Sequence, residues 1–135
     1  MKYSEYSVVI VGSGAAGLYA ALKISQQINL PEGVLLLTKS YLGNSNSLYA
    51  QGGIVGVLHQ NPEDCVEKHV EDTLTAGAGL SDRSTVEYIS EASDEVINDL
   101  IENGVDFDRN ADGELTFTLE AAHSIRRILH AGGDA

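Results

Sequence analysis

The stretch that decides the fold is YSVVIVGSGAAGLYAA, at residues 6–21. Its β-branched residues 8–11 are typical of a short strand that is buried on both faces. The strand runs without a spacer into a G-x-G-x-x-G motif at residues 12–17, and good helix formers follow. In this context of strand, turn and helix, the motif indicates a dinucleotide-binding site. A glycine-rich structural turn is the alternative interpretation.

Each glycine of the motif has a distinct task in the predicted turn. Gly12 permits the tight turn, Gly14 lets the backbone approach a pyrophosphate, and Gly17 lets the helix pack closely on the strand. The N–H groups at the helix start and the positive end of the helix dipole attract the anion. We therefore expect this turn to bind phosphate.

A second buried strand is predicted at residues 34–37, after a turn at residues 29–33. Strand, helix and strand within about thirty residues are typical of the βαβ unit of a dinucleotide-binding fold. The predicted fold class is therefore α/β, a Rossmann-like domain with a parallel sheet. The second strand ends in Thr38-Lys39 instead of the acid that binds the ribose of NAD. This departure weakens a simple NAD interpretation and places a cation at the expected nucleotide site.

A polar, glycine-rich segment follows at residues 40–56, SYLGNSNSLYAQGGIVG. Its asparagine, serine and glutamine side chains supply hydrogen-bonding groups, and its glycines allow a ligand to approach the backbone. Loops of this length inside compact domains are usually functional. We expect this segment to contact a ligand, with an ordinary surface loop as the alternative.

Charge and composition limit the partners. The chain has 20 acidic and 8 basic residues and a net charge of -12, which opposes nucleic acid and anionic membranes as partners. The single cysteine, Cys65, excludes an internal disulfide and an all-cysteine metal site. No apolar stretch is long enough to span a bilayer, and no signal peptide is recognisable. The expected compartment is the cytoplasm.

Two amphipathic helices are predicted in the second half. The first spans residues 61–77 with Asn61 as its N-cap. Its polar residues, His69 among them, are interpreted as a solvated face, and a metal site there is disfavoured because no third ligand has a helical spacing. The second begins with a capping box at residues 84–87 and ends at Gly104.

The last part of the chain is predicted as a hairpin followed by a helix. The hairpin covers residues 107–119 around an Asp-Gly turn, and the basic stretch at residues 120–130 is most simply an amphipathic helix. The sheet then has only two obvious parallel strands, whereas a doubly wound domain needs more to cover both faces. We therefore expect the chain to be part of something larger.

Five segments resemble the L-aspartate oxidases, which belong with the flavoprotein subunits of succinate dehydrogenase and fumarate reductase. These segments are GSGAAGLYAA, LYAQGGI, HVEDTLTAGAGLSD, ENGVDFD and EAAHSIRRILHAGGDA. The resemblance runs from about Val8 to the last residue, and members of the family are several times longer. It implies that residues 1–135 are the N-terminal part of an FAD-binding domain. The rest of that domain, the capping domain and the C-terminal helical domain are not included.

The resemblance implies FAD as the cofactor. The matching pyrophosphate turn consists of Gly12, Ser13, Gly14, Ala15, Ala16 and Gly17. Lys39 matches the lysine that follows the second strand in this family. The matching flavin loop consists of Asn46, Ser47, Leu48, Tyr49, Ala50, Gln51, Gly52 and Gly53. In the dehydrogenases and reductases a histidine at the position of Asn46 is bonded to the flavin. An amide cannot form that bond, so FAD is expected to be held noncovalently.

The resemblance also implies a substrate. Glu120 matches the glutamate that orients L-aspartate, and a carboxylate suits an α-ammonium group, which succinate lacks. The implied product, iminoaspartate, feeds quinolinate formation in NAD biosynthesis. The implied electron acceptor is oxygen or fumarate, and quinolinate synthase is a candidate partner. Ala121-Ala122 stands where the family commonly has Gly-Gly.

No catalytic residue of the family is matched in this chain. The basic and histidine side chains at the end are interpreted as structural; they are His123, Arg126, Arg127 and His130. Two other functions stay open. One is a fumarate reductase or succinate dehydrogenase flavoprotein subunit, which Asn46 disfavours. The other is a non-catalytic nucleotide-binding fragment, inactive alone and able to pair through its sheet edge.

Overall fold

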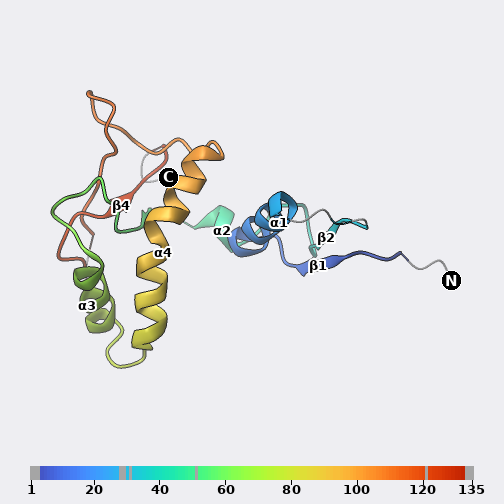
Figure 1. Cartoon of the computed structure of the whole chain (residues 1–135), viewed down its shortest axis with the longest axis horizontal. Helices are drawn as coiled ribbons and strands as arrows, with labels where there is room; N and C mark the ends of the chain where they lie inside the picture. Colours follow the sequence, from blue (N-terminus) through green and yellow to red (C-terminus); the bar gives the residue numbers. More distant parts are fainter. Residues whose placement is uncertain (1–3, 28–29, 31, 51, 121, 133–135) are drawn as a thin grey trace. The chain divides into compact units, whose positions relative to one another are not determined.

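The structure is a computed structural model that describes residues 4–27, 30, 32–50, 52–120 and 122–132. The chain divides into two compact units, Met1–Ala50 and Gln51–Ala135 (Figure 1). Some residues of the predicted turn, loop and family segments lie outside the described residues: Asn29, Pro31, Gln51, Ala121 and residues 133–135.

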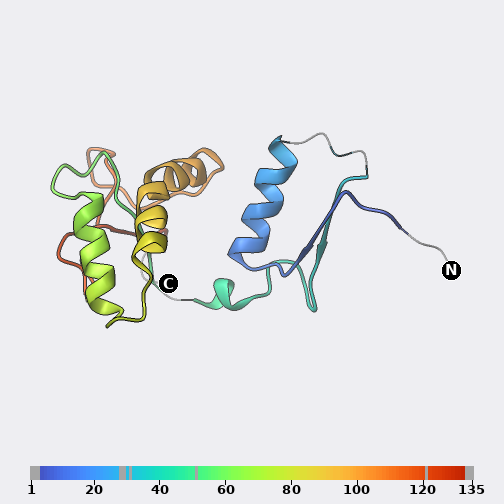
Figure 2. The same ribbon diagram turned by 60° about the horizontal axis from the view of Figure 1, so that its bottom comes forward.

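The first unit is the predicted βαβ unit. It consists of β1 (Val8–Val11), α1 (Ala15–Gln27) and β2 (Val34–Leu37), followed by the short helix α2 (Asn46–Tyr49). β1 and β2 pair in parallel along their whole length, and α1 lies alongside them (Figure 2). The parallel pairing confirms the topology predicted from the hydrophobic runs on either side of the glycine motif.

The prediction that both strands are buried on both faces is wrong for the described residues. Val9 is 51% exposed, Val11 82% and Leu37 45%. Val8 and Ile10, which alternate with them in β1, are half-buried, and Ile10 lies beneath Gly17 of α1. The helix therefore covers one face of the sheet, and in the described part of the chain the other face keeps apolar side chains exposed.

The second unit holds the main hydrophobic core. Its elements are β3 (Ile54–Val55), α3 (Val66–Ala76), α4 (Arg83–Glu102) and β4 (Ile128–Leu129). α3 and α4 pack against each other (Figure 1), and β3 pairs with β4 in an antiparallel ladder. The core cluster consists of Leu58, Ile97, Phe107, Leu115 and Leu129. β4 thus contributes Leu129 to the core.

The predicted start of the first downstream helix is wrong. α3 begins at Val66 with Cys65 as its N-cap, and no side chain caps it. The Asn61 side-chain amide instead donates to the Arg126 carbonyl oxygen at 2.7 Å. The Asn61 side chain, which the local pattern predicted as the N-cap, therefore forms a long-range hydrogen bond instead. The predicted end is confirmed, because Gly77 is the C-cap.

The capping box predicted at residues 84–87 is also wrong. The N-cap of α4 is Asp82, whose carboxylate accepts from the Thr85 backbone N–H at 2.9 Å. Asp82 precedes the predicted box, so the helix starts earlier. Its carboxylate binds a backbone N–H of the first helical turn that has no partner within the helix, as the predicted cap would have done. The end is confirmed: Gly104 has φ +97° and donates its N–H to the Ile101 carbonyl oxygen.

The predicted hairpin is present. A bridge joins Arg109 and Leu115, and Gly113 lies between them with φ +83°. The Asn110 N–H donates to the Glu114 carbonyl oxygen at 2.9 Å, which closes the turn. The Asp-Gly signal therefore gave the correct position of the chain reversal.

The helix predicted at residues 120–130 is wrong. Ile128 pairs with Thr118 across a bridge, and with Leu129 it forms β4. Residues 127–130 are all buried in succession. A helix on the surface of a core buries one stripe and exposes the rest, whereas a strand covered on both sides buries successive residues. Burial on both sides therefore favours the strand.

A buried ion cluster holds this strand in place. The Arg127 side chain is fully buried, and its Nε and Nη2 lie 2.7 Å from the two carboxylate oxygens of Asp64. Its Nη1 donates to Asp72, which also accepts from the backbone N–H and hydroxyl of Ser124. Burial raises the pKa of Asp72, but the hydrogen bonds from Ser124 and Arg127 outweigh it and lower this pKa to about 2. Asp72 therefore stays ionised at neutral pH, and the cluster joins α3 to the segment before β4.

His69 belongs to the same cluster. Its side chain is buried, and its ring lies 5.8 Å from that of His123 between centroids. Burial lowers the pKa of His69, and the positive charge of Arg127 lowers it further. The interpretation of His69 as part of a solvated face is therefore wrong. The His69 ring lies beside that of His123, whose Nδ1 is 3.3 Å from Nη1 of Arg127.

The described residues hold neither a metal-ligand cluster nor a membrane-spanning helix. In this part of the chain, no three His, Cys, Asp or Glu side chains converge as metal ligands would. None of its helices is both long enough and apolar enough to cross a membrane.

Replacing Arg127 by methionine should lower the free energy of unfolding by about 3–5 kcal/mol, because a fully buried Asp64 carboxylate loses its cation. Urea denaturation followed by circular dichroism measures this loss. The matched control is Arg83→Met, since Arg83 also pairs with two carboxylates but its side chain is 55% exposed. Little change is expected there. Equal stabilities of the two variants would contradict the role given to the cluster.

Candidate functional site

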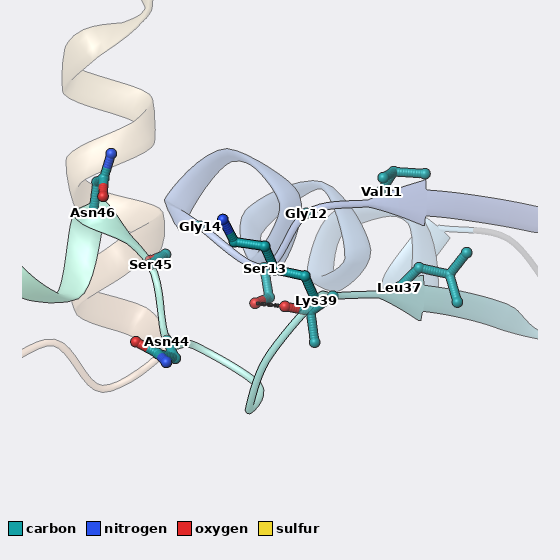
Figure 3. A pocket seen from close by; sticks show the side chains of 10 residues that line it. Val11, Gly12, Ser13, Gly14, Leu37, Lys39, Asn44, Ser45 and Asn46 are labelled. Carbon is teal, nitrogen blue, oxygen red and sulfur yellow. Dashed lines mark hydrogen bonds between the residues drawn. The ribbon is translucent and has the colours of Figure 1, made fainter.

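A pocket of about 450 Å³ lies at the carboxyl ends of β1 and β2 (Figure 3). Ligands of open α/β sheets bind at this edge of the strands. The pocket is lined by Val11, Gly12, Ser13, Gly14, Leu37, Thr38, Lys39, Asn44, Ser45 and Asn46. Five of the residues predicted to bind the cofactor are brought together here: Gly12, Ser13, Gly14, Lys39 and Asn46.

Two glycines shape the turn as predicted. Gly12 has φ +110°, a conformation that side-chain-bearing residues rarely adopt, and its N–H donates to the Leu37 carbonyl oxygen at 2.8 Å. A Cβ at Gly17 would overlap the carbonyl oxygen of Gly12. The close approach of α1 to the turn is confirmed. The approach of Gly14 to a pyrophosphate stays a prediction, although Gly14 does line the pocket.

The hydroxyl of Ser13 locks the turn to the strand beside it. Ser13 is 3% exposed, and its hydroxyl donates to the Thr38 hydroxyl oxygen at 3.0 Å. It also accepts from the Gly43 backbone N–H at 3.2 Å. The Ser13 hydroxyl therefore forms its hydrogen bonds within the protein. Its partner Thr38 was not among the predicted site residues. Only a contact across the sheet could have revealed this role.

Ser47 contacts the start of α1. Its Oγ accepts from the Ala15 backbone N–H at 3.1 Å. A Cβ at Gly14 would lie 3.3 Å from the same oxygen, so a glycine leaves room for this contact. Ser47 therefore occupies one of the N–H groups that begin the helix, which is where an anion would bind.

The other described residues of the predicted loop do not line this pocket. Leu48 and Tyr49 are 64% and 72% exposed, and Ala50 is exposed as well. Gly52 and Gly53 belong to the second unit. There, a Cβ at Gly53 would overlap the Ile128 side chain and approach the Leu129 carbonyl oxygen closely, so Gly53 allows β4 to pack closely. Ala15, Ala16 and Gly17 begin α1 and are not among the lining residues of the pocket.

The electrostatics of the pocket differ from those of the whole chain. Lys39 is the charged side chain among its described lining residues, whereas the chain has a net charge of -12. The start of α1 adds the positive end of a helix dipole. A phosphate group therefore meets a locally favourable potential here. The glycine turn, the helix start and the lysine together fit the pyrophosphate of a dinucleotide.

The predicted substrate residue, Glu120, lies in the second unit. Its side chain is 51% exposed, and its carbonyl oxygen accepts from the His123 N–H at 3.2 Å. Within this turn Ala122 has φ +71°. An alanine there costs roughly 1–2 kcal/mol relative to an unstrained backbone. A glycine, which the family commonly has at position 122, would adopt this left-handed conformation without that cost.

This fold and pocket define a dinucleotide-binding α/β protein. Residues 7–135 match the family model of the FAD binding domain, and the chain belongs to that family. FAD is therefore its cofactor. The residue-by-residue assignment of the FAD contacts stays a prediction.

Curated relatives share a common name. The L-aspartate oxidase of Agrobacterium fabrum is 50% identical over 127 residues, covering 93% of this chain and 23% of that protein. The L-aspartate oxidase of Bacillus subtilis is 39% identical over 132 residues, covering 98% of this chain and 24% of that protein. The chain spans about a quarter of the length of these relatives.

Solved structures of related proteins share the fold. A quinol-fumarate reductase with menaquinol molecules has a TM-score of 0.88 at 27% identity, covering 99% of this chain and 23% of that chain. The Sdh1 complex of Mycobacterium smegmatis in the apo form has a TM-score of 0.86 at 28% identity, covering 96% and 21%. The sequence-based prediction of this flavoprotein family and of its α/β fold is confirmed.

Replacing Gly17 by alanine should abolish FAD binding, because the added Cβ would overlap the Gly12 carbonyl oxygen and push α1 away from the turn. Quenching of FAD fluorescence on titration with the protein measures the affinity. The control is Ser25→Ala, on an exposed position of the same helix. Wild-type affinity in Gly17→Ala would contradict the role given to this close approach.

Proposed function

We propose that the protein containing this chain oxidises L-aspartate to iminoaspartate, with FAD as the oxidant, for quinolinate and NAD biosynthesis. The observation that carries the proposal is Glu120, a half-exposed carboxylate at the position that orients the substrate in the L-aspartate oxidases. Membership of the FAD binding domain family and 39–50% identity to proteins named L-aspartate oxidase support it.

The first unit would hold the cofactor through its pyrophosphate. The N–H groups of the turn and of the start of α1, other than that of Ala15, would donate to the phosphate oxygens, and Lys39 would balance their charge. Asn46 and Ser47 would contact the cofactor from the loop. When bound, FAD supplies the oxidising power for removing two electrons and two protons from the amino acid, which turns its amine into an imine.

Glu120 would select the substrate. Its carboxylate can accept hydrogen bonds from the α-ammonium group of L-aspartate, and charge-assisted bonds of this kind are stronger than neutral ones. Succinate and fumarate have no such group. A site with an acceptor for a substrate N–H discriminates against ligands that lack it, because the acceptor is then left unpaired.

Fumarate reduction or succinate oxidation is the second candidate function. The TM-score of 0.88 to a quinol-fumarate reductase favours it. Asn46 disfavours it, because the resembling dehydrogenases and reductases have a flavin-bonded histidine at that position. We propose oxygen or fumarate as the electron acceptor, quinolinate synthase as a candidate partner and the cytoplasm as the compartment.

The protein expressed from its complete coding sequence should release FAD on acid precipitation, because the Asn46 amide cannot bond covalently to the flavin. The measurement is the flavin absorbance of the supernatant and of the washed pellet. Flavin that stays with the pellet would show a covalent bond and contradict this assignment.

Replacing Glu120 by glutamine should lower kcat/KM for L-aspartate at least about thirtyfold, because the ammonium group loses its charged acceptor. This factor corresponds to a loss of about 2 kcal/mol of transition-state stabilisation. Fumarate reduction by the reduced enzyme should change little. The matched control is Glu114→Gln, an exposed glutamate of the neighbouring hairpin. Equal losses with both substrates would show that Glu120 is structural.

A further inference from the structure

His130 is a buried histidine next to the proposed substrate residue. It directly follows β4 and is 6% exposed. Its Nε2 lies 2.9 Å from the Thr118 hydroxyl oxygen and 3.5 Å from Oε1 of Glu120. The ring therefore presents one nitrogen to two oxygens, and one of them belongs to the carboxylate that the proposed function uses.

The surrounding groups decide where the ring hydrogen lies. The Thr118 hydroxyl is 3.4 Å from the Ile128 carbonyl oxygen, which can only accept. If the hydroxyl donates there, its oxygen is left to accept from His130. An ionised Glu120 carboxylate can also only accept. Both oxygens therefore favour the tautomer in which Nε2 carries the hydrogen.

The backbone holds this ring firmly. The His130 carbonyl oxygen accepts from the Asp108 N–H at 2.8 Å, and Thr118 exchanges backbone hydrogen bonds with Ile128. A Cβ at Gly53 would lie 3.1 Å from Cε1 of the ring, so the glycine gives the ring its space. The ring is fixed, whereas the Glu120 side chain is half-exposed. A buried donor beside a half-exposed carboxylate can set the orientation of that carboxylate.

We propose that His130 is a positioning residue for Glu120, holding its carboxylate oriented towards the ammonium group of the substrate. This inference rests on the proposed function. The separation of 3.5 Å is long for a hydrogen bond, and such contacts often tighten only when the substrate is bound. Thr118 serves the same purpose by fixing the tautomer of the ring.

The test compares His130→Phe with His130→Gln in the protein expressed from its complete coding sequence. His130→Phe keeps a ring but removes the donor, and it should lower kcat/KM for L-aspartate about tenfold while sparing fumarate reduction. His130→Gln keeps a side-chain N–H and should retain most of the activity. His59→Phe is the control, because His59 lies in the same unit, outside the Arg127 cluster, and its side chain is 91% exposed. It should leave the ratio of the two activities unchanged.

A double-mutant cycle separates positioning from stability. In the Glu120→Gln background, His130→Phe should cause no further loss with L-aspartate, because the carboxylate it serves is gone. If His130→Phe does not fold, Thr118→Val gives the same test and should also lower the ratio. An unchanged ratio in the folded variant, or full additivity with Glu120→Gln, would overturn the proposal.

A readout that does not depend on turnover is the ¹⁵N resonance of His130 Nε2. It should move in Glu120→Gln and stay in place in Glu114→Gln. If the ¹⁵N resonance of His130 does not move in Glu120→Gln, the proposed contact between the two side chains is wrong. If the wild-type protein oxidises no L-aspartate while this resonance responds, the proposed function fails and the contact between His130 and Glu120 stands.

Discussion

The second unit depends on one buried guanidinium. Removing the charge of Arg127 from water costs several kcal/mol, and only excellent geometry offsets that cost. The fork on Asp64 and the bond to Asp72 supply this geometry. Because these partners lie before and within α3, the cluster ties that helix to the residues just before β4. The turn that carries Glu120 and the ring of His130 flank the stretch that this cluster fixes.

The packing of α1 on the glycine turn in the first unit depends on the lack of a side chain at Gly17. At Gly17 the helix approaches the Gly12 carbonyl oxygen so closely that no Cβ fits between them. This approach brings the start of α1 to the end of β1 and creates the pocket beside Lys39. A strongly acidic chain can thus present a small positive site to an anion. Its donors are backbone groups, which the net charge does not reveal.

The sequence predicted the elements whose causes are local. The glycine motif between two apolar runs gave the βαβ unit, and Gly77, Gly104 and the Asp-Gly turn gave correct ends and a correct reversal. It failed where distant partners compete with local patterns. Asn61 has a capping pattern but donates to Arg126, far along the chain.

The candidate site was predictable to the same degree. Its glycines, Lys39 and Asn46 follow from the motif and from the family resemblance. The lock between Ser13 and Thr38 and the contact between His130 and Glu120 join residues that only the fold brings together. The strand at Ile128 was missed because its burial on both sides depends on neighbours from other parts of the chain.

The most direct measurement compares the binding of two flavins, of which only one carries the pyrophosphate that the pocket is proposed to bind. FAD carries a pyrophosphate and riboflavin does not, so under the proposed assignment only FAD can bind through the turn at residues 12–17 and Lys39. Apoprotein from the complete coding sequence should bind FAD in a calorimetric titration and should show no measurable binding of riboflavin at the same concentrations. Equal affinity for the two flavins would contradict the assignment of this pocket to the pyrophosphate.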